Sequence, residues 1–479
     1  MKTSISYFIC WNRCAVLIVN FAALLGLCMQ LPAYPLQNLT TNVNMFCGTG
    51  GGGNAANLCP GSVAPFGMVQ WSPDTTSHWP GGYLYSDTQI RSFGLTHASG
   101  AGCNFGGDCG FTPFLGTLGG SPYTGSNYWD VTSGYFSTFT HADESASPGY
   151  YSVLFNNNIR TELTTTARTG FGRFTYPSGN PASMLINAGG DANGTINASI
   201  QINAAGNEIS GWTQMPGMCG TASTKMYFDI VFDHAFAAYG VWSGATYTAN
   251  GTSASGAHSW TYVNFNLPGG GVVLARTAVS YVSVANAQAN LQAESPNTNF
   301  TSAGFDAITN STTTNWNAYL NKIQFAGGTA ADVKTFYTML YHCLQSPSVV
   351  SDENGQFTGL DNNVHTFAGH TKYGWFSGWD IYRSEVQLMA MLDPDRASDM
   401  AQSLVLDAQY GGGMPRWSVA TADSGIMIGD PGTPIIASMY AFGATNFNTA
   451  NALAAMVKGG NESGDQDHQW QYYGTRCEP

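Results

Sequence analysis

The chain has 479 residues, which at about 150 residues per domain predicts two or three domains. Only 9% of the residues are charged and the net charge is −13, whereas roughly 25% charged residues is usual. Because phosphate binding requires a basic surface, this balance excludes nucleic acid as a main partner. The 12 tryptophans and 24 tyrosines fit a neutral, hydroxyl-rich ligand, although most aromatic side chains are expected to fill the core.

The N-terminus has the pattern of a targeting segment. Lys2 and Arg13 precede an apolar run from Ala15 to Met29. This run is shorter than the roughly 20 residues of a membrane span and has the length of a signal-peptide core. Residues 1–33 are therefore predicted to be a signal peptide or, as the alternative, an N-terminal anchor. The mature protein is expected to be exported, either secreted or periplasmic, with no membrane contact beyond this leader.

Residues 42–300 have the pattern of antiparallel β-strands. In GYYSVLFNNNIRTELTTTARTGFGRFTYP, apolar or β-branched residues occupy alternate positions, and Asn and Gly clusters interrupt the pattern; these residues are Tyr151, Val153, Phe155, Ile159, Thr161 and Leu163. Period-two alternation is typical of strands with one wet face. Many short strands without intervening helices predict a β-sandwich domain.

The pattern changes to a helical one after about residue 300. Val333, Phe336, Leu340 and Leu344 lie on one face of a predicted helix that Pro347 ends. Further helical stretches are predicted at Asp380–Leu392, Ser398–Tyr410, Pro434–Phe442 and Thr449–Lys458. The chain is thus divided into a sandwich at 42–300, a linker at 301–330 and a helical domain at 331–479.

Seven of the ten cysteines follow the leader. Cys47 with Cys59 and Cys103 with Cys109 are the local pairs in glycine-rich loops, so these four are the disulfide candidates in an exported protein. Neither spacing has the paired C-x2-C pattern of a zinc site. The odd seventh cysteine implies at least one free thiol.

Several long strings resemble glycoside hydrolase family 92. In the first part these are NMFCGTGGGG, CPGSVAPFGMVQWSPDT, GYLYSDTQIRSFGLTHASGAGC, ESASPGYYSVLFNNNIRTELTTTAR and SYVSVANAQANLQAE. In the helical part they are LYHCLQSPSVVSDENGQFTGLD, GWDIYRSEVQLMAMLDPDRASDMAQSLV and GGGMPRWSVATADSGIMIGDPGTPIIA. The matches run in order from about residue 42 to 445.

The resemblance implies a calcium-dependent, inverting exo-α-mannosidase that acts on mannose-terminated glycans or glycoproteins. The implied fold is an antiparallel β-sandwich followed by an (α/α)6 helical barrel, with the site at their interface. Inversion uses a carboxylic acid at the leaving oxygen and a carboxylate base that activates water. The calcium ion, bound by oxygen ligands, is expected to grip two hydroxyls of the sugar.

The sequence departs from the family in its catalytic strings. The family's acid lies in a Glu-Gly-Asn-x-x-Gln-Tyr stretch, its base in an Asn-Asp-Asp-x-Gly stretch and a calcium ligand in an Asn-Glu-Pro segment, and none of these occurs among the 479 residues. The chain therefore resembles the amino-terminal two thirds of such an enzyme, with only part of the barrel. We expect no catalytic residue and no metal ligand within it, little or no hydrolysis, and exposed apolar helix faces.

The resemblance assigns substrate binding to residues in both domains. In the helical part they are Asp380 and Arg383 in GWDIYR and Arg416 and Trp417 in MPRW. In the sandwich they are Phe46, Gly48, Thr49, Gly50, Asp74 and Arg91. Each has a structural alternative: Asp380 can stabilise a helix N-terminus, Arg383 can pair with Asp380, Asp74 can pair with Arg91, and the glycines can serve a tight turn.

Two other functions remain open at this stage. The chain can be a non-catalytic mannose- or glycan-binding protein, or the product of an inactive gene fragment. It can also be a different carbohydrate-active enzyme that uses Asp380 or Asp352. A binding protein would be monodisperse and saturable by mannosides without turnover, whereas an incomplete enzyme would aggregate or need its missing half supplied.

Overall fold

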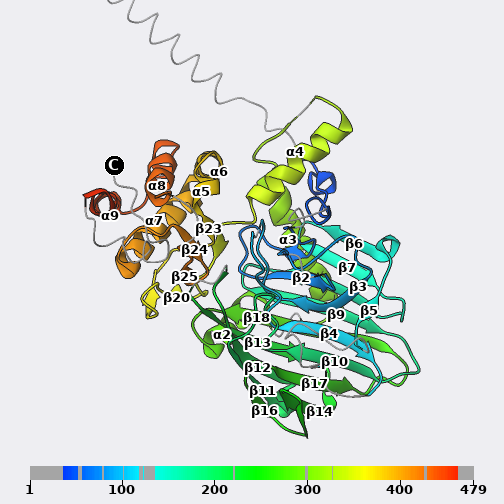
Figure 1. The fold of residues 1–479 in the computed structure, drawn as a ribbon. Coiled ribbons are helices and arrows are strands. Elements are labelled where there is room, and N and C mark those ends of the chain that lie inside the picture. The colour runs from blue at the N-terminus through cyan, green and yellow to red at the C-terminus, as the bar shows by residue number, and fades with distance from the viewer. Residues whose placement is uncertain are drawn as a thin grey trace, which may run out of the picture. The chain divides into compact units, whose positions relative to one another are not determined.

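Two antiparallel sheets of nine strands each lie between Ser62 and Ser280 (Figure 1). The structure is a computed structural model that describes residues 36–51, 57–77, 80–100, 102–117, 122, 135–218, 222–296, 300–325, 327–425 and 429–461. The predicted leader at 1–33 lies outside these ranges. The described residues from Leu39 onward belong to one compact unit.

The first sheet has the strand order β1-β2-β3-β4-β10-β17-β14-β15, with β5 paired to β3. Its strands are β1 (Ser62–Val63), β2 (Gln70–Thr75), β3 (Gln89–Gly94), β4 (Gly110–Leu115), β5 (Ser137–Thr138), β10 (Ala182–Asn187), β14 (Phe236–Ser243), β15 (Thr246–Ala249) and β17 (Ser259–Phe265). The second sheet has the order β16-β11-β12-β13-β18-β9-β8-β7-β6. Its strands are β6 (Glu144–Ser147), β7 (Tyr150–Leu154), β8 (Arg160–Thr165), β9 (Thr169–Tyr176), β11 (Asn197–Asn203), β12 (Glu208–Met215), β13 (Thr224–Phe232), β16 (Ser253–Ser255) and β18 (Gly271–Ser280).

The two sheets pack face to face as a sandwich. Along β12, buried residues alternate with half-buried ones over the whole strand, as expected for a strand with one core face and one wet face. Between the sheets, the ring of Phe174 lies 6.5 Å from the rings of both Trp71 and Phe111. The sandwich predicted from the period-two alternation is therefore confirmed.

Helices dominate after β18. They are α2 (Val284–Glu294), α3 (Ser302–Leu320), α4 (Ala330–Cys343), α5 (Gly378–Ile381), α6 (Glu385–Leu392), α7 (Pro394–Gly411), α8 (Gly432–Ala441) and α9 (Thr449–Asn461). Short strands lie between them at β19 (Ser348–Val349), β20 (Gln356–Thr358), β21 (Val364–Thr366), β22 (Tyr373–Gly374), β23 (Phe376–Ser377), β24 (Trp417–Val419) and β25 (Ala422–Asp423). The 3-10 turns are η1 (Thr40–Asn42), η2 (His141–Asp143) and η3 (Ala204–Gly206). The predicted order, antiparallel sheets followed by helices, is confirmed.

Two helical segments differ from the predicted boundaries. The stretch predicted as one helix at Asp380–Leu392 is two helices, α5 and α6, because the backbone leaves the helical conformation at Ser384. The stretch 301–330, predicted as a linker, contains α3, whose Trp316 is fully buried and donates its indole N–H to the Val63 carbonyl. The segment therefore packs on the sandwich through a large aromatic side chain.

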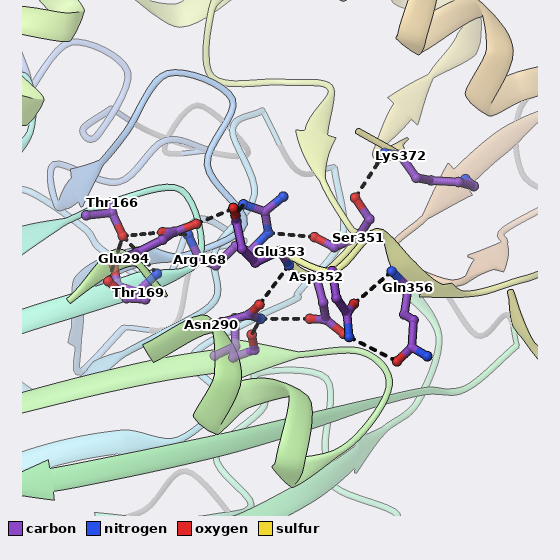
Figure 2. A network of polar contacts seen from close by, with 12 residues as sticks. Thr166, Arg168, Thr169, Asn290, Glu294, Ser351, Asp352, Glu353, Gln356 and Lys372 are labelled. Carbon is purple, nitrogen blue, oxygen red and sulfur yellow. Dashed lines mark hydrogen bonds and ion pairs between the residues drawn. The ribbon is translucent and has the colours of Figure 1, made fainter. Parts of the chain in front are cut away.

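A buried arginine joins the sandwich to the helical part (Figure 2). Arg168, in the turn between β8 and β9, is only 9% exposed. Its Nη1 lies 2.8 Å from Glu294 Oε1 at the end of α2 and 2.9 Å from Glu353 Oε2 in the loop after β19. Its Nε donates to the Ser351 carbonyl at 2.7 Å. One guanidinium thus connects three segments that lie far apart in the sequence.

The neighbouring carboxylate Asp352 completes this junction (Figure 2). It is 2% exposed and accepts hydrogen bonds from Ser280 Oγ, Asn286 Nδ2 and Asn290 Nδ2 at 2.7–2.8 Å. Burial raises the pKa of Asp352, and these three donors offset part of that effect. Both carboxylate oxygens accept hydrogen bonds from buried groups of the protein, which argues against Asp352 as a catalytic group.

Both predicted disulfides are wrong. Cys47, Cys59 and Cys109 are free thiols, and Cys103 forms a disulfide but not with Cys109. Cys109, the residue immediately before β4, is instead fully buried in the hydrophobic core. Closeness in sequence does not ensure the narrow range of Cα separation and side-chain direction that a disulfide requires.

Apolar side chains are exposed on three of the last helices. Met391 of α6, Tyr440 of α8 and Leu453 and Val457 of α9 are each at least 50% exposed. On α9 the opposite side is also apolar, since Ala452 is buried. A helix that is apolar on opposite sides is typical of one packed between two layers. Within the described ranges, every helix is too short or too polar to cross a lipid bilayer.

Replacing Arg168 by Ala tests the junction. The variant leaves Glu294, whose side chain is 14% exposed, without its counter-charge, and such a loss lowers the free energy of unfolding by about 3 kcal/mol. Urea denaturation monitored by tryptophan fluorescence measures the change. Arg160→Ala, an exposed arginine on the adjacent strand β8, is the matched control and should change stability little. Equal stability of the two variants would contradict the role of the junction.

Candidate functional site

A cavity of about 350 Å³ lies where sandwich loops meet the helical part. The sandwich contributes the start of β2 and the loop at 98–100, and the helical part contributes α4, α5, α6 and the strands β23 and β24. The lining residues are Gln70, Ala98, Ser99, Gly100, Met218, Met339, His342, Cys343, Ser346, Ser348, Trp375, Ser377, Asp380, Ile381, Glu385 and Trp417. The set combines aromatic walls with two carboxyl groups, as in sites for small polar ligands.

Two of the predicted residues line the cavity. Asp380, in α5, is exposed and accepts a hydrogen bond from Ser377 Oγ at 2.6 Å. Trp417, in β24, is 6% exposed, and its backbone N–H donates to Asp423 Oδ1 at 3.1 Å. A carboxylate and an indole on one cavity wall fit a sugar, with hydroxyls for the carboxylate and a C–H face for the ring.

The approach of α5 to β24 depends on a glycine. A side chain at Gly378, the first residue of α5, would lie 2.4 Å from the Arg416 carbonyl oxygen and 2.4 Å from Pro431. No larger residue fits without moving the backbone. Gly378 in the string GWDIYR therefore holds Asp380 beside Trp417.

Arg383 and Arg416, both predicted to bind substrate, lie outside the described lining of the cavity. The alternative ion pair of Arg383 with Asp380 does not form among the described residues, and Arg383 Nε donates to the Trp379 carbonyl at 3.1 Å. Arg416 is buried and its Nη1 donates to the Gly425 carbonyl at 3.2 Å. The described lining of the cavity includes Trp417 but neither arginine.

The predicted glycine loop of the sandwich is a tight turn outside the cavity lining. Thr49 is fully buried and donates from Oγ1 to the Phe46 carbonyl at 2.9 Å. Gly48 has φ +79°, and a side chain there would meet Leu58 at 2.5 Å. The Thr49 carbonyl accepts the N–H of Tyr85, while Gly50 lies against the same tyrosine. Within the described ranges, none of Phe46, Gly48, Thr49 and Gly50 lines the cavity.

Asp74 and Arg91 are also used inside the sandwich. Asp74 is 4% exposed, and its Oδ1 lies 3.1 Å from His97 Nε2 while its Oδ2 accepts the N–H of Gly94. Arg91 Nε donates to the Thr75 carbonyl rather than to Asp74. Burial lowers the pKa of His97, but the charge and hydrogen bond of Asp74 outweigh it and the net pKa is raised. This pair connects β2 to the loop that follows β3.

Sequence reasoning missed Glu385 and Trp375. Glu385, the first residue of α6, is half-buried, and burial together with the charge of Asp380 raises its pKa to about 8. Trp375 has φ +64°, which is rare for a bulky residue and is seen where surrounding structure constrains the backbone. Its ring packs edge-on against Phe105 of the sandwich, with centroids 4.6 Å apart. The one sequence signal for Glu385 is its place five residues after Asp380.

Comparison with known proteins places both halves of the chain in one family. The glycosyl hydrolase family 92 N-terminal domain matches residues 42–280, and the family 92 catalytic domain matches residues 286–476. A family GH92 alpha-mannosidase from Bacteroides thetaiotaomicron, solved alone and with mannoimidazole, is 28% identical with a TM-score of 0.81, over 91% of this chain and 58% of that one when solved alone.

Two further relatives agree. A family GH92 inverting mannosidase from Bacteroides thetaiotaomicron VPI-5482 is 26% identical with a TM-score of 0.76, over 90% of this chain and 57% of that one. An uncharacterized secreted glycosidase from Arthroderma benhamiae is 24% identical over 339 residues, which are 65% of this chain and 42% of that protein. The chain thus spans less than two thirds of the length of each of these relatives.

The Asp74–His97 pair predicts a pH-dependent effect on stability. Because the folded-state pKa of His97 is raised, its pairing energy is fully present below about pH 6.5 and is lost as the pH rises through that raised pKa. Asp74→Asn should lower the free energy of unfolding by about 1–3 kcal/mol, with the larger loss at pH 6 than at pH 9. Urea denaturation at both pH values measures this difference.

The control for that experiment is a second aspartate–histidine pair. Asp361 lies 3.0 Å from His365 in an exposed loop, so Asp361→Asn should change stability little at either pH. A loss in Asp74→Asn that stays constant from pH 6 to pH 9 would show that His97 does not titrate between these pH values and would contradict this prediction.

Proposed function

Since the chain belongs to glycosyl hydrolase family 92, we propose that it binds terminal α-linked mannose in the cavity between sandwich and helices. This is the substrate-binding part of an exo-α-mannosidase activity. The observation that carries this proposal is that Asp380 and Trp417, from two strings that resemble the family, line one cavity together with Trp375. The mannosidases of similar structure, one of them solved with mannoimidazole, support mannose as the ligand.

We further propose that the polypeptide of this sequence binds mannosides without hydrolysing them. The 479 residues contain neither the acid string nor the base string of the family. General acid and base groups contribute about 10²–10⁴-fold each to the rate, so a site without them retains binding alone. Hydrolysis by inversion is assigned to proteins of the family that also contain those two strings.

The described part of the chain offers few donor groups for a calcium ion. Among the described residues, no group of three or more His, Cys, Asp or Glu side chains converges to hold a metal ion. The two carboxyls of the cavity, Asp380 and Glu385, fall short of the six to eight oxygen ligands that Ca²⁺ takes. Asp380 and Glu385 alone therefore do not fit a calcium site.

Export is part of the same proposal. The apolar run at Ala15–Met29 has the length of a signal-peptide core, and the relative from Arthroderma benhamiae is described as secreted. An extracellular protein would meet mannose-terminated glycans and glycoproteins directly. An enzyme built on Asp352 is disfavoured, because that carboxylate is enclosed by Ser280, Asn286 and Asn290.

Calorimetric titration with methyl α-D-mannopyranoside tests the proposal. Wild-type protein should bind saturably and release no 4-nitrophenol from 4-nitrophenyl α-mannoside beyond the buffer rate. Asp380→Ala should weaken binding at least about tenfold, because a charge-assisted hydrogen bond to a hydroxyl is lost. Asp361→Ala, an exposed aspartate outside the cavity, should bind like the wild type.

Two results would contradict this account. Equal affinity of Asp380→Ala and wild type would remove the cavity as the mannose site. Saturable release of 4-nitrophenol by the wild type would show that residues within this sequence perform the hydrolysis.

A further inference from the structure

Glu385 is a carboxyl group without a partner at the wall of the cavity. No hydrogen bond or ion pair joins its side chain to another residue in the described part of the chain, and its only charged neighbour is the carboxylate of Asp380. Glu385 is half-buried, so its carboxyl keeps access to the cavity that it lines. An unpartnered carboxyl that is open to a cavity is placed to meet a ligand.

Among the described residues, the groups that surround Glu385 bring no positive charge to it. From α5 it faces Asp380, which Ser377 holds at 2.6 Å. From α4 it faces His342 and Cys343. Burial lowers the pKa of His342 below its ordinary value, which favours the neutral imidazole. Burial raises the pKa of Cys343 to about 11, so this thiol is protonated at neutral pH.

Arg383, two residues before Glu385, and Arg416, beside the cavity residue Trp417, donate hydrogen bonds to backbone carbonyls. Arg383 donates to the Trp379 carbonyl and Arg416 to the Gly425 carbonyl. Two carboxylates in one cavity without a cation repel each other, and the neutral form of Glu385 removes this repulsion. The cavity thus favours the state in which Glu385 keeps its proton.

We propose that Glu385 determines the specificity of the cavity by binding the sugar as a neutral carboxylic acid, whose O–H donates to an oxygen of an uncharged mannoside. A protonated carboxyl has one donor to offer, and the ring and glycosidic oxygens of a sugar only accept. The Asp380 carboxylate in the same lining repels anions, so the cavity would favour neutral sugars over sugars that carry a carboxylate or phosphate. This inference rests on the proposed mannose site.

The pH dependence of binding follows from the pKa of about 8 for Glu385. A bound neutral sugar displaces water from the carboxyl and makes its ionised form less favourable, so the pKa rises further in the complex. By linkage, affinity is constant well below pH 8 and falls above it. At pH 9 the dissociation constant should be about tenfold larger than at pH 6.5.

The binding test compares wild type with Glu385→Gln by calorimetric titration with methyl α-D-mannopyranoside from pH 6 to pH 9.5. Gln carries a neutral donor at every pH, so Glu385→Gln should keep the affinity that the wild type has at pH 6.5 and show no pH dependence. Asp361→Asn, at an exposed carboxylate outside the cavity, should retain the wild-type pH profile. A flat wild-type profile, or a Glu385→Gln profile parallel to it, would overturn the proposal.

A second measurement reports on Glu385 without any ligand. A carboxyl whose pKa is raised on folding costs stability as the pH rises from its unfolded value, near 4.5, to its folded value, near 8. Glu385→Gln should therefore become more stable than wild type over this range and match it at pH 4. Absence of mannoside binding at every pH, with this stability gain present, would refute the mannose site alone; absence of the stability gain would refute the neutral Glu385.

Discussion

The ion pair of Arg168 with Glu294 and Glu353 is the interaction on which the site depends. It connects the β8–β9 turn of the sandwich to the end of α2 and to the loop after β19. At the same junction, Asp352 accepts hydrogen bonds from Ser280 and two asparagines. The cavity draws its walls from both sides of this junction. Polar groups that are fully satisfied in the interior specify one arrangement of the parts they join.

The two carboxyl groups of the cavity, Asp380 and Glu385, differ in their exposure and in their hydrogen-bond partners. Asp380 is exposed and held by Ser377, whereas Glu385 is half-buried, unpartnered and poised to keep its proton up to about pH 8. The break between α5 and α6 at Ser384 creates this difference, because a continuous helix would present both residues in one regular register. Trp375 and Trp417 supply apolar walls, so a neutral sugar fits better than a charged one.

Part of this could be predicted from the sequence. Period-two alternation predicted the sandwich, and family strings predicted that Asp380 and Trp417 share a site. Glu385 escaped prediction because its character depends on α4, which lies some 40 residues earlier in the chain, and on the helix break. Asp74, Arg91 and the loop of Gly48 match the same strings, yet their polar atoms bond within the sandwich. Cys109 is buried in the core rather than paired with Cys103, since packing outweighs closeness in sequence.

A crystal structure of the chain soaked with methyl α-D-mannopyranoside at pH 6.5 tests the central claim most directly. The account predicts density for one sugar in the cavity, with a hydroxyl within hydrogen-bonding distance of Asp380, an oxygen facing Glu385 and a C–H face against Trp375 or Trp417. Density for the sugar elsewhere on the protein, with the cavity containing only water, would contradict it.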